Sequence, residues 1–359
     1  MDKLGLLKNR FNGTKVFVTG HTGFKGAWLL VLLNQLGAIV KGYSLEPEDE
    51  KAIFNSFNDL SFESIIGDLR NLQQLEDEIL SFQPDVIFHL AAQPLVRLSY
   101  KIPAETFEVN VIGTANLLSA VIKLKKKCEI VCITTDKVYH NNEWIYPYRE
   151  TDRLGGYDPY SASKAACEIV ISSYKNSFFN PEKYSEHLKS ITSVRAGNVI
   201  GGGDWSKDRL LPDIVNALLN DKEIEVRNPN AVRPWQHVLE PLFGYLLLAV
   251  KMNDDPIKFA TSYNFGPSTN DNLSVKKILD IAIKAYGKGS YVIKEDKEQP
   301  HEAGLLRLDI SKVSSELNWQ PRFTAEEAVQ LTIEWYKNYH AGKLPIDLIK
   351  NDIETFLNT

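Results

Sequence analysis

Two side chains that could transfer a proton lie four residues apart in the segment YSASK, residues 160–164. Asp158 and Pro159 come directly before it and are typical of a helix start, where proline is favoured in the first turn. In a helix this spacing places Tyr160 and Lys164 on one face. An ammonium beside a phenol favours the phenolate and lowers the pKa of the tyrosine. The pair therefore predicts proton abstraction from a hydroxyl while hydride leaves its carbon.

The spacing alone is a weak signal, because Tyr339 and Lys343 match it as well. That second pair has Gly342 beside the lysine and lies near the chain end, outside any strand–helix context. We interpret it as a chance match.

Two threonines, an aspartate and a lysine follow one another at residues 134–137, at the end of an apolar run. Ligands gather at the carboxyl ends of parallel strands, and Thr135 can hydrogen-bond the hydroxyl that reacts. An enzyme that only oxidises or epimerises needs no further acid or base there. Asp136 and Lys137 therefore indicate a second reaction, in which a keto group at carbon 4 of a sugar makes the proton on carbon 5 acidic and water is lost from carbon 6. The alternative for Asp136 and Lys137 is a solvated turn.

A glycine-rich turn precedes these residues in the chain. Gly20, Gly23 and Gly26 come directly after the apolar run at 15–19 and open a helical pattern at 24–36. The first glycine permits a tight turn, the second lets the backbone approach a pyrophosphate, and the third permits close packing of helix on sheet. Helix N-terminal amides then face the phosphate. The context predicts a dinucleotide-binding turn, with a glycine-rich connection that binds nothing as the alternative.

The position that usually binds the cofactor ribose, at the end of the second strand, holds Ser44. A serine cannot accept both ribose hydroxyls as a carboxylate does, and it does not repel a 2′-phosphate. The residues alone therefore leave the choice between NAD and NADP open, and weak binding is expected. Asp68, after the third strand, fits an adenine contact or a helix N-cap, or both.

Short apolar runs alternate with helical patterns through the first half of the chain. We expect strands at 15–19, 39–43, 62–66, 86–90, 130–134 and 190–195, and helices at 24–36, 72–80, 103–123 and 159–174. This alternation predicts an α/β fold, a Rossmann-type doubly wound parallel sheet covered on both faces. We expect an NAD-binding Rossmann domain at 1–195, which also receives segments near 236–265, and a smaller mixed α/β substrate lobe at 196–359. A strand at 262–265 could return to the sheet.

The composition excludes several classes of protein. Of 359 residues, 43% are hydrophobic and 24% charged, as in ordinary globular proteins, and the net charge of −5 leaves no basic excess for nucleic acid. Cys128, Cys132 and Cys167 form neither a disulfide framework nor a zinc-type spacing, so no metal is expected. No run approaches about 18 apolar residues, and the N-terminus lacks the features of a signal peptide. We expect a cytoplasmic location.

Four segments together resemble the nucleotide-sugar 4,6-dehydratases of the extended short-chain dehydrogenase/reductase family, and the resemblance covers nearly the whole chain. They are GHTGFKG at 20–26, TTDKVY at 134–139, RAGNVIGGGD at 195–204 and RPWQHV at 233–238. Epimerase relatives usually carry small or hydroxyl residues where Asp136 and Lys137 stand. Dehydratases that act on dTDP-glucose or GDP-mannose have Asp-Glu or a plain Glu there. Asp136-Lys137 and His21 look like the branch that acts on CDP-glucose.

The resemblance implies three steps at one site, with NAD regenerated. Tyr160, assisted by Thr135 and Lys164, oxidises carbon 4. Asp136 is then the acid at the departing carbon 6 hydroxyl, and Lys137 occupies the position of the base at carbon 5. Hydride finally returns to carbon 6. The implied product is CDP-4-keto-6-deoxyglucose, a precursor of deoxysugars in surface polysaccharides such as the lipopolysaccharide O-antigen.

The resemblance also implies the residues that bind ligands. Those expected at the NAD site are Gly20, His21, Gly23, Phe24, Lys25, Gly26, Ser44, Asp68, Leu69, Leu90, Ala91, Ala92, Thr134, Tyr160 and Lys164. Those expected at the substrate are Gln93, Arg97, Asn198, Arg209, Arg233 and His301, with Glu302 as a second candidate for the nucleotide. Each substrate residue could instead tether the two lobes. The helices near 103–123 and 159–174 would pair across a two-fold axis, which gives a homodimer or a dimer of dimers.

Two other functions stay open. A nucleotide-sugar 4-epimerase would use the same scaffold, but it has no need of Asp136 and Lys137. A redox-inactive NAD-binding regulator would have no need of Tyr160 and Lys164. The sugar nucleotide could also carry dTDP, UDP or GDP, since only the resemblance selects cytidine.

Overall fold

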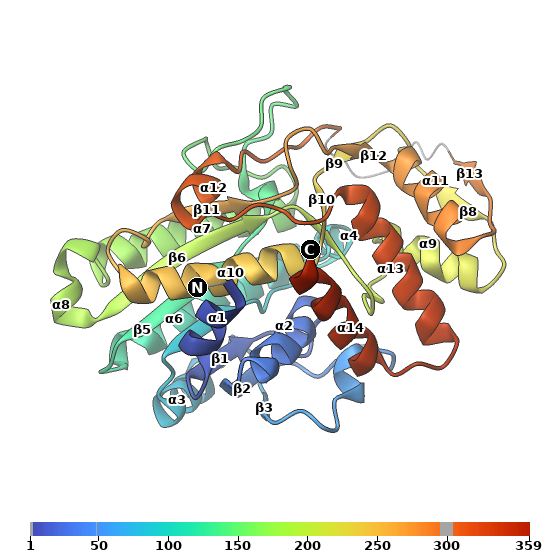
Figure 1. The fold of residues 1–359 in the computed structure, drawn as a ribbon. Helices are drawn as coiled ribbons and strands as arrows, with labels where there is room; N and C mark the ends of the chain where they lie inside the picture. The colour runs from blue at the N-terminus through green and yellow to red at the C-terminus, as the bar shows by residue number, and fades with distance from the viewer. Residues whose placement is uncertain (1–2, 48, 295–303) are drawn as a thin grey trace.

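The computed structural model describes residues 3–47, 49–294 and 304–359. A seven-stranded sheet forms its centre, in the order β11-β6-β5-β4-β1-β2-β3, and every neighbouring pair is parallel (Figure 1). The strands are β1 (Lys15–Thr19), β2 (Ile39–Ser44), β3 (Glu63–Ile66), β4 (Val86–His89), β5 (Cys128–Ile133), β6 (Lys189–Ala196) and β11 (Ser262–Phe265). The predicted doubly wound fold is confirmed. The strand order reverses between β1 and β4, where such sheets bind ligands.

Helices cover both faces of the sheet (Figure 1). On one face lie α1 (Lys3–Phe11), α2 (Phe24–Gln35) and α10 (Leu239–Asp254), and on the other lie α3 (Leu72–Phe82), α6 (Gly113–Lys123) and α7 (Pro159–Ser177). Alternate residues of the central strands β1, β4 and β5 enter different apolar cores: Val16 and Val18 pack on the first set of helices and Phe17 on the second. Because both faces are buried, the strands are almost continuously apolar.

The helix expected over 103–123 has an interruption. It consists of α5 (Pro103–Phe107), a π-helical turn η2 (Glu108–Ile112) and α6. Asn110, buried in that turn, accepts a hydrogen bond from the backbone N–H of Gln93 at 2.8 Å and donates one to Ser163 Oγ at 2.8 Å. The widened turn thus ties the loop after β4 to α7. A π turn of this kind often marks a functional region.

The C-terminal half forms a smaller lobe beside the carboxyl ends of the strands (Figure 1). It contains three two-stranded pairings, β7 (Asn198–Ile200) with β10 (Trp235–His237), β9 (Val232–Arg233) with β12 (Leu273–Ser274), and β8 (Ile224–Val226) with β13 (Tyr291–Ile293). Its helices are α9 (Leu210–Leu219), α11 (Val275–Tyr286), α12 (Ser311–Leu317), α13 (Ala325–His340) and α14 (Pro345–Asn358). The strand expected near 262–265 is present as β11 and lies beside β6 in the main sheet.

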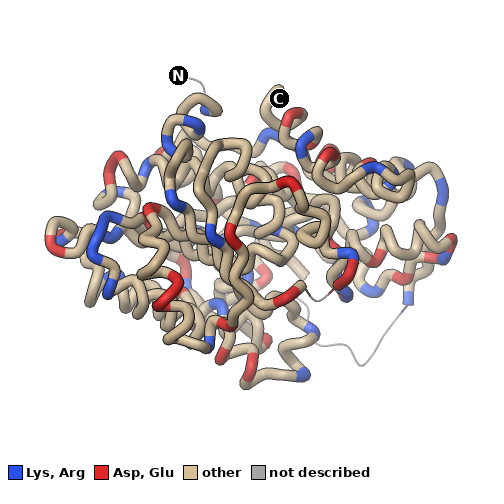
Figure 2. The backbone as a smooth tube through the Cα atoms, turned by 90° about the horizontal axis from the view of Figure 1, so that it is seen from below, with Lys and Arg blue, Asp and Glu red and all other residues tan. Residues whose placement is uncertain are grey.

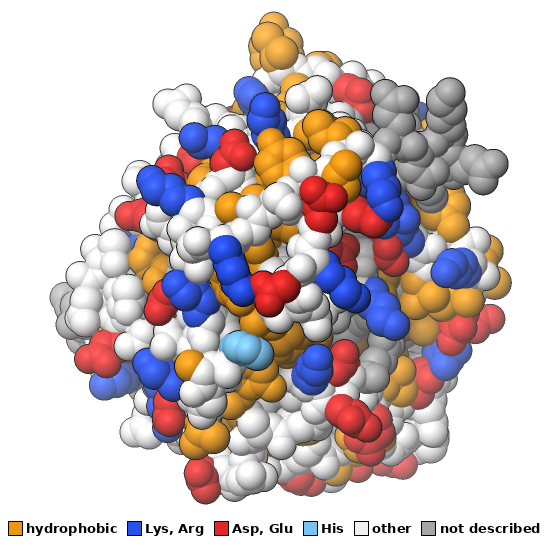
Figure 3. Space-filling view, turned by 90° about the vertical axis from the view of Figure 1, so that its right-hand side faces the viewer, with side chains coloured by type: hydrophobic (Ala, Val, Ile, Leu, Met, Phe, Trp, Pro, Cys, Tyr) orange, Lys and Arg blue, Asp and Glu red, His pale blue; other side chains and the backbone are white. Residues whose placement is uncertain are grey.

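The remaining elements are short connections. They are α4 (Val96–Lys101), α8 (Tyr184–His187), and the 3₁₀ turns η1 (Ile53–Ser56), η3 (Asp136–Val138) and η4 (Pro181–Lys183). Basic and acidic residues are interspersed along the whole backbone (Figure 2), and the face beside the C-terminal lobe shows the same mixture (Figure 3). Within the described ranges, none of the helices has the length and apolar character that a bilayer crossing requires.

Helix α14 carries a buried carboxyl group that has no hydrogen-bond partner for one oxygen. Asp352 Oδ2 lies 3.9 Å from His237 Nε2, and each of these two atoms is without a hydrogen bond in the described structure. Burial raises the pKa of Asp352 to about 7 and lowers that of His237 to about 3. A carboxyl whose pKa is raised on folding binds a proton in the native state that the unfolded chain has lost. Its contribution to stability therefore falls as the pH rises from about 4 to about 7.

We expect Asp352→Asn to stabilise the protein at pH 8, because asparagine has no charge to bury. A shift of about three pKa units corresponds to an upper limit of about 4 kcal/mol, so a gain of about 2–4 kcal/mol in the free energy of unfolding is expected. At pH 4 the gain should disappear. Urea unfolding at both pH values measures it, with Asp347→Asn at the exposed start of α14 as the control. Equal gains at pH 4 and pH 8 would contradict this explanation.

Candidate active site

The residues expected to do chemistry meet at the carboxyl end of β5, where α7 begins and η3 follows the strand. Tyr160 is buried in the first turn of α7. Asp158 caps this helix by accepting a hydrogen bond from the backbone N–H of Ser161 at 2.9 Å. Ser99 Oγ accepts another from the backbone N–H of Tyr160 at 3.1 Å. These bonds hold the start of α7, and with it the phenol, against the end of the strand.

Burial dominates the electrostatics of the tyrosine and the lysine. It raises the pKa of Tyr160 to about 12, although a hydrogen bond with Thr135 and the charge of Arg209 act the other way. Lys164 Nζ donates to the carbonyl of Ile133 at 3.1 Å, and burial lowers its pKa. The expectation that the lysine brings the tyrosine pKa down is therefore wrong for this structure, because the amine turns to the end of β5.

Asp136 is buried one residue further along the chain. Its Oδ1 accepts a hydrogen bond from Thr135 Oγ1 at 3.0 Å, while its Oδ2 is buried without a hydrogen bond from any described residue. Burial raises the pKa of Asp136, although the charges of Lys137 and Arg233 lower it. A carboxyl group that holds its proton beside a phenol can act as a general acid. Lys137, half-buried, follows it in η3.

Lys25 belongs to the same group of charges. The pKa of its amine is lowered to about 7, mainly by burial and then by the charges of Lys164 and Arg209, while the charge of Asp136 acts the other way. The sequence placed this lysine only in the glycine turn. In the fold its charge interacts with those of Lys164, Arg209 and Asp136. The site thus gathers Lys25, Lys164 and Arg209 around Asp136 and Tyr160.

The glycine turn has the shape that the sequence predicts. A Cβ on Gly26 would lie 2.0 Å from the carbonyl oxygen of Gly20, and one on Gly20, where φ is +76°, would lie 2.6 Å from the backbone nitrogen of Ala91. Gly23, by contrast, would meet nothing nearer than 3.5 Å. It caps α2 without a side-chain hydrogen bond, so the first amides of the helix stay available for a ligand.

His21 points away from the open side of this turn. Its Nε2 lies 2.7 Å from Ser64 Oγ. Its ring packs edge-on against the ring of Phe54, with 5.2 Å between the ring centroids. Burial lowers its pKa to about 4. The side chain that the resemblance put at the cofactor is therefore a core residue packed against β2 and β3. Phe24, at the start of α2, is half-buried beside the same turn.

The residues expected at the adenosine end have partners within the protein. Ser44 Oγ lies 2.8 Å from Thr22 Oγ1. The Asp68 carboxylate binds Arg70, with 2.6 Å between Oδ2 and Nη2, and the hydrogen bond from Arg70 lowers the pKa of Asp68. The N-cap of α3 is Asn71, so the N-cap interpretation of Asp68 is wrong. Four further residues flank this end of the sheet: Leu69 is buried, and Leu90, Ala91 and Ala92 are half-buried after β4.

The structure describes the surroundings of most of the expected substrate residues. Gln93 is bonded within the cofactor half: its Nε2 donates to Thr106 Oγ1 at 2.9 Å and its Oε1 accepts from the backbone N–H of Leu95 at 2.6 Å. Arg209 binds Asp204 at 2.8 Å, and Arg233 donates to the carbonyl of Val232 at 3.0 Å. Asn198 begins β7 and is half-buried. His301 and Glu302 lie outside the described residues.

One arginine in this region was not singled out by the sequence. Asp208 Oδ1 lies 3.7 Å from Arg97 Nη1 and 3.9 Å from Arg227 Nη1, so one carboxylate serves two guanidinium groups. Asp208 also has φ of +61°, a conformation that few residues other than glycine adopt. No motif marks Arg227, which simply follows β8, and only the fold brings it to Arg97.

Comparisons with known proteins agree with this geometry. The chain matches the family model described as GDP-mannose 4,6-dehydratase over residues 17–332. A CDP-glucose 4,6-dehydratase of Salmonella typhimurium is 45% identical over 98% of this chain and 98% of its own. Among solved structures, the dTDP-glucose 4,6-dehydratase of Streptomyces venezuelae has a TM-score of 0.78 at 23% identity, covering 92% of this chain and 99% of that one. An epimerase of Methanothermobacter thermautotrophicus has a TM-score of 0.80 at 19% identity, covering 97% of each chain.

We expect Gly26→Ala to destabilise the protein and Gly23→Ala to be tolerated. The added methyl group at residue 26 collides with backbone that cannot move alone, which should cost at least about 1–3 kcal/mol of unfolding free energy. At residue 23 the methyl group enters open space at ordinary contact distance, so a change within about 0.5 kcal/mol is expected. Urea unfolding of the two variants measures the difference. Equal losses would show that the turn is not packed as described.

Proposed function

We infer that this chain, which belongs to the GDP-mannose 4,6-dehydratase family, is a hydro-lyase that converts CDP-glucose to CDP-4-keto-6-deoxyglucose and water. The observation that carries this proposal is the Asp136 carboxyl, buried with one oxygen unpartnered and bonded through the other to Thr135. An epimerase of similar fold needs no such acid. The likeness to the Salmonella enzyme supports cytidine as the base of the substrate nucleotide.

NAD is the cofactor that we propose for the site. The residues fit it, because the turn at Gly20 and Gly26 leaves no room for side chains and Gly23 leaves its outer side open. A pyrophosphate there would meet the first amides of α2 and their partial positive charge. When bound, NAD accepts hydride from carbon 4 of the sugar and returns it to carbon 6.

Tyr160 takes the proton of the carbon 4 hydroxyl in the first step. Tyr160 enters this step as the phenolate, which the hydrogen bond with Thr135 and the positive charge of Arg209 favour, and Thr135 holds the same hydroxyl. Lys164, one turn along α7, adds a second positive charge at the end of β5. The step therefore needs a phenol, a hydroxyl and two cations, all of which converge here.

Asp136 and Lys137 act in the second step. The carbon 5 proton goes to the Lys137 amine, and the Asp136 carboxyl gives its proton to the carbon 6 hydroxyl, which leaves as water. Burial raises the pKa of Asp136, which favours the protonated carboxyl that this step needs. Lys137 then returns a proton to carbon 5, and the proton held by Tyr160 restores Asp136. The atoms balance: CDP-glucose gives the 4-keto-6-deoxy sugar nucleotide and one water.

The arginines of the C-terminal half bind the diphosphate in this proposal. Arg209 and Arg233 provide charge-assisted hydrogen bonds, and Arg97 on α4 and Asn198 on β7 are the further substrate contacts. Residues 1–195, with the returning strand β11, make the cofactor half, and residues 196–359 supply the substrate half.

We further propose a cytoplasmic homodimer. Apolar side chains on α5, α6 and α7 are exposed, among them Phe107 at 38%, Ile112, just before α6, at 52% and Ile169 at 62%. Exposed apolar side chains gathered on adjacent helices favour burial against a second copy. The 4-keto-6-deoxy product suits later steps of deoxysugar synthesis.

We expect the protein with NAD to convert CDP-glucose to a 4-keto-6-deoxy sugar nucleotide, detected by its absorbance in alkali. In a panel that also holds dTDP-, UDP- and GDP-linked substrates, turnover should be at least about tenfold faster with CDP-glucose, a preference of about 1.4 kcal/mol. Recovery of CDP-galactose would indicate an epimerase instead. Faster turnover of a sugar linked to another nucleotide would keep the assignment as a dehydratase and overturn only the choice of cytidine.

Asp136→Asn should separate oxidation from water loss. The amide is nearly isosteric but cannot donate a carboxyl proton, so elimination should slow by about 10²–10⁴-fold. Oxidation of carbon 4, followed by the absorbance of reduced nicotinamide in a single turnover, should stay within about tenfold of the wild type. Asp152→Asn, in the following loop, is the control and should leave both steps unchanged. Native-rate product formation by the Asp136 variant would place the acid elsewhere.

A further inference from the structure

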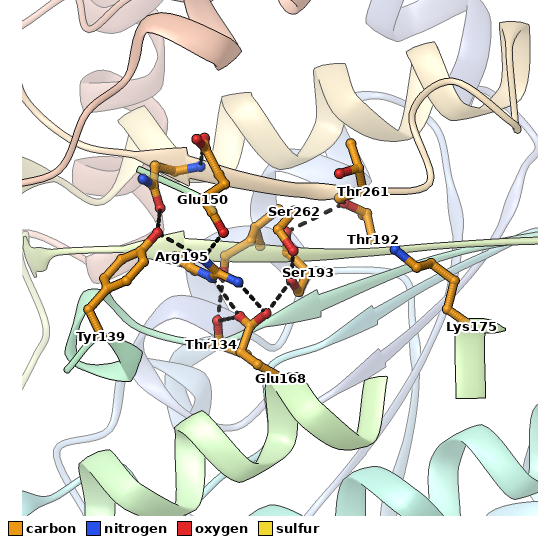
Figure 4. Close-up of polar contacts among 12 residues, drawn as sticks. Thr134, Tyr139, Glu150, Glu168, Lys175, Thr192, Ser193, Arg195, Thr261 and Ser262 are labelled. Atoms are coloured by element: carbon orange, nitrogen blue, oxygen red, sulfur yellow. Dashed lines mark hydrogen bonds and ion pairs between the residues drawn. The ribbon is translucent and has the colours of Figure 1, made fainter. Parts of the chain in front are cut away.

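A buried ion pair lies behind the active site, between α7 and β6 (Figure 4). The guanidinium of Arg195 and the carboxylate of Glu168 form a bidentate ion pair, with 3.0 Å between Nε and Oε1 and 2.8 Å between Nη2 and Oε2. The side chains are only 4% and 3% exposed. Glu168 is one helical turn beyond Lys164, and no sequence motif drew attention to it.

Two hydroxyls complete the shell of the carboxylate. Thr134 Oγ1 donates to Glu168 Oε1 at 2.5 Å, and Ser193 Oγ donates to Oε2 at 2.7 Å. Burial alone would raise the pKa of Glu168, but the Arg195 charge and these bonds outweigh it and hold the pKa below its usual range. The carboxylate is therefore ionised, and it accepts four hydrogen bonds from three residues.

Arg195 extends the network to the segment that follows Asp136 and Lys137. Its Nη1 donates to the Tyr139 hydroxyl at 2.8 Å and to the carbonyl of Glu150 at 3.0 Å. The Tyr139 hydroxyl donates in turn to Asn264 Oδ1 at 2.7 Å. Glu168 and Arg195 therefore join α7 to Thr134, which precedes Asp136, and to Tyr139, which follows it.

Stability alone does not explain such a pair. Replacing a buried ion pair by apolar side chains is often neutral or stabilising, because the desolvation cost offsets much of the attraction. What this pair does provide is a polar link from α7 to β6 and, through Thr134, to the end of β5. It also places a negative charge near the ammonium of Lys164, which raises the pKa of that amine.

We propose that Glu168 is a positioning residue for the reaction, which holds the end of β5 against α7. The kinetic test of this role rests on the proposed function, and the structural contacts that suggest the role do not. Glu168 touches neither Tyr160 nor Asp136. It acts through Thr134, which precedes Thr135, and through the charge it presents to Lys164.

The chain offers a matched control on the same strand. Glu129, near the opposite end of β5, is buried to 1% exposure and pairs with Arg10 at 2.6 Å. Both glutamates are buried acceptors of an arginine, so removing either charge leaves a largely buried guanidinium, 13% exposed in Arg10 and 4% in Arg195, without its carboxylate. Only one of them is joined to the site. A purely structural role predicts the same consequences for Glu168→Gln and Glu129→Gln.

The test compares Glu168→Gln, Glu168→Asp and Glu129→Gln in the full chain with NAD and CDP-glucose. We expect Glu168→Gln to lower kcat by about 100-fold or more with KM within about threefold, because positioning acts on the transition state. Glu129→Gln should lose similar unfolding free energy but keep kcat within about threefold. Glu168→Asp keeps the charge but shortens the reach, so its kcat should fall between the wild type and Glu168→Gln.

A second measurement does not depend on the reaction. The titration of Lys164, followed by NMR of lysine-labelled protein without substrate, should move to lower pH in Glu168→Gln, because a neighbouring negative charge has been removed. It should not move in Glu129→Gln or in Glu168→Asp. An unchanged titration in Glu168→Gln, or equal kcat in the two glutamine variants, would overturn the positioning role. An absence of wild-type turnover with CDP-glucose would instead overturn the proposed function, while the titration would still decide the role of Glu168.

Discussion

The removal of Asp136 from water is the constraint on which the site depends. A buried carboxyl group costs free energy when ionised, so it retains its proton unless nearby cations compensate. Here Lys137 and Arg233 offset part of that cost, and Thr135 occupies one carboxyl oxygen. The other oxygen stays without a partner among the described residues. Burial thus favours the protonated form of this carboxyl, which is the form that the proposed elimination needs.

This constraint also explains why so many charges converge on the switch point of the sheet. Parallel strands bring the turn after β1, the loop after β4 and the end of β5 to one edge, and α7 adds the phenol and its lysine. Lys25 and Arg209 come from opposite halves of the chain, yet both affect the same group of ionisable side chains. Their charges favour anions that form during oxidation and elimination. Epimerases share the scaffold, so the function is decided by these side chains and not by the fold.

Local pattern was enough to predict the doubly wound sheet, the glycine turn and the helix that carries Tyr160 and Lys164. It failed where a side chain's direction depends on residues far away in sequence. His21 lies in the phosphate-binding motif, but Ser64 and Phe54 hold its ring in the core. Asp68 resembles a helix cap, but Asn71 performs that role. The π-helical turn around Asn110 and the pairing of Glu168 with Arg195 also depend on tertiary contacts, which no local spacing records.

The central claim is that one site oxidises carbon 4, expels water and returns the same hydride to carbon 6. Isotope tracing with CDP-glucose carrying deuterium at carbon 4 tests it most directly. The account predicts a 4-keto-6-deoxy product with that deuterium at carbon 6 and no net consumption of NAD. A 4-epimer with deuterium at carbon 4, or a 4-keto-6-deoxy product that has lost the deuterium to the solvent, would contradict the account.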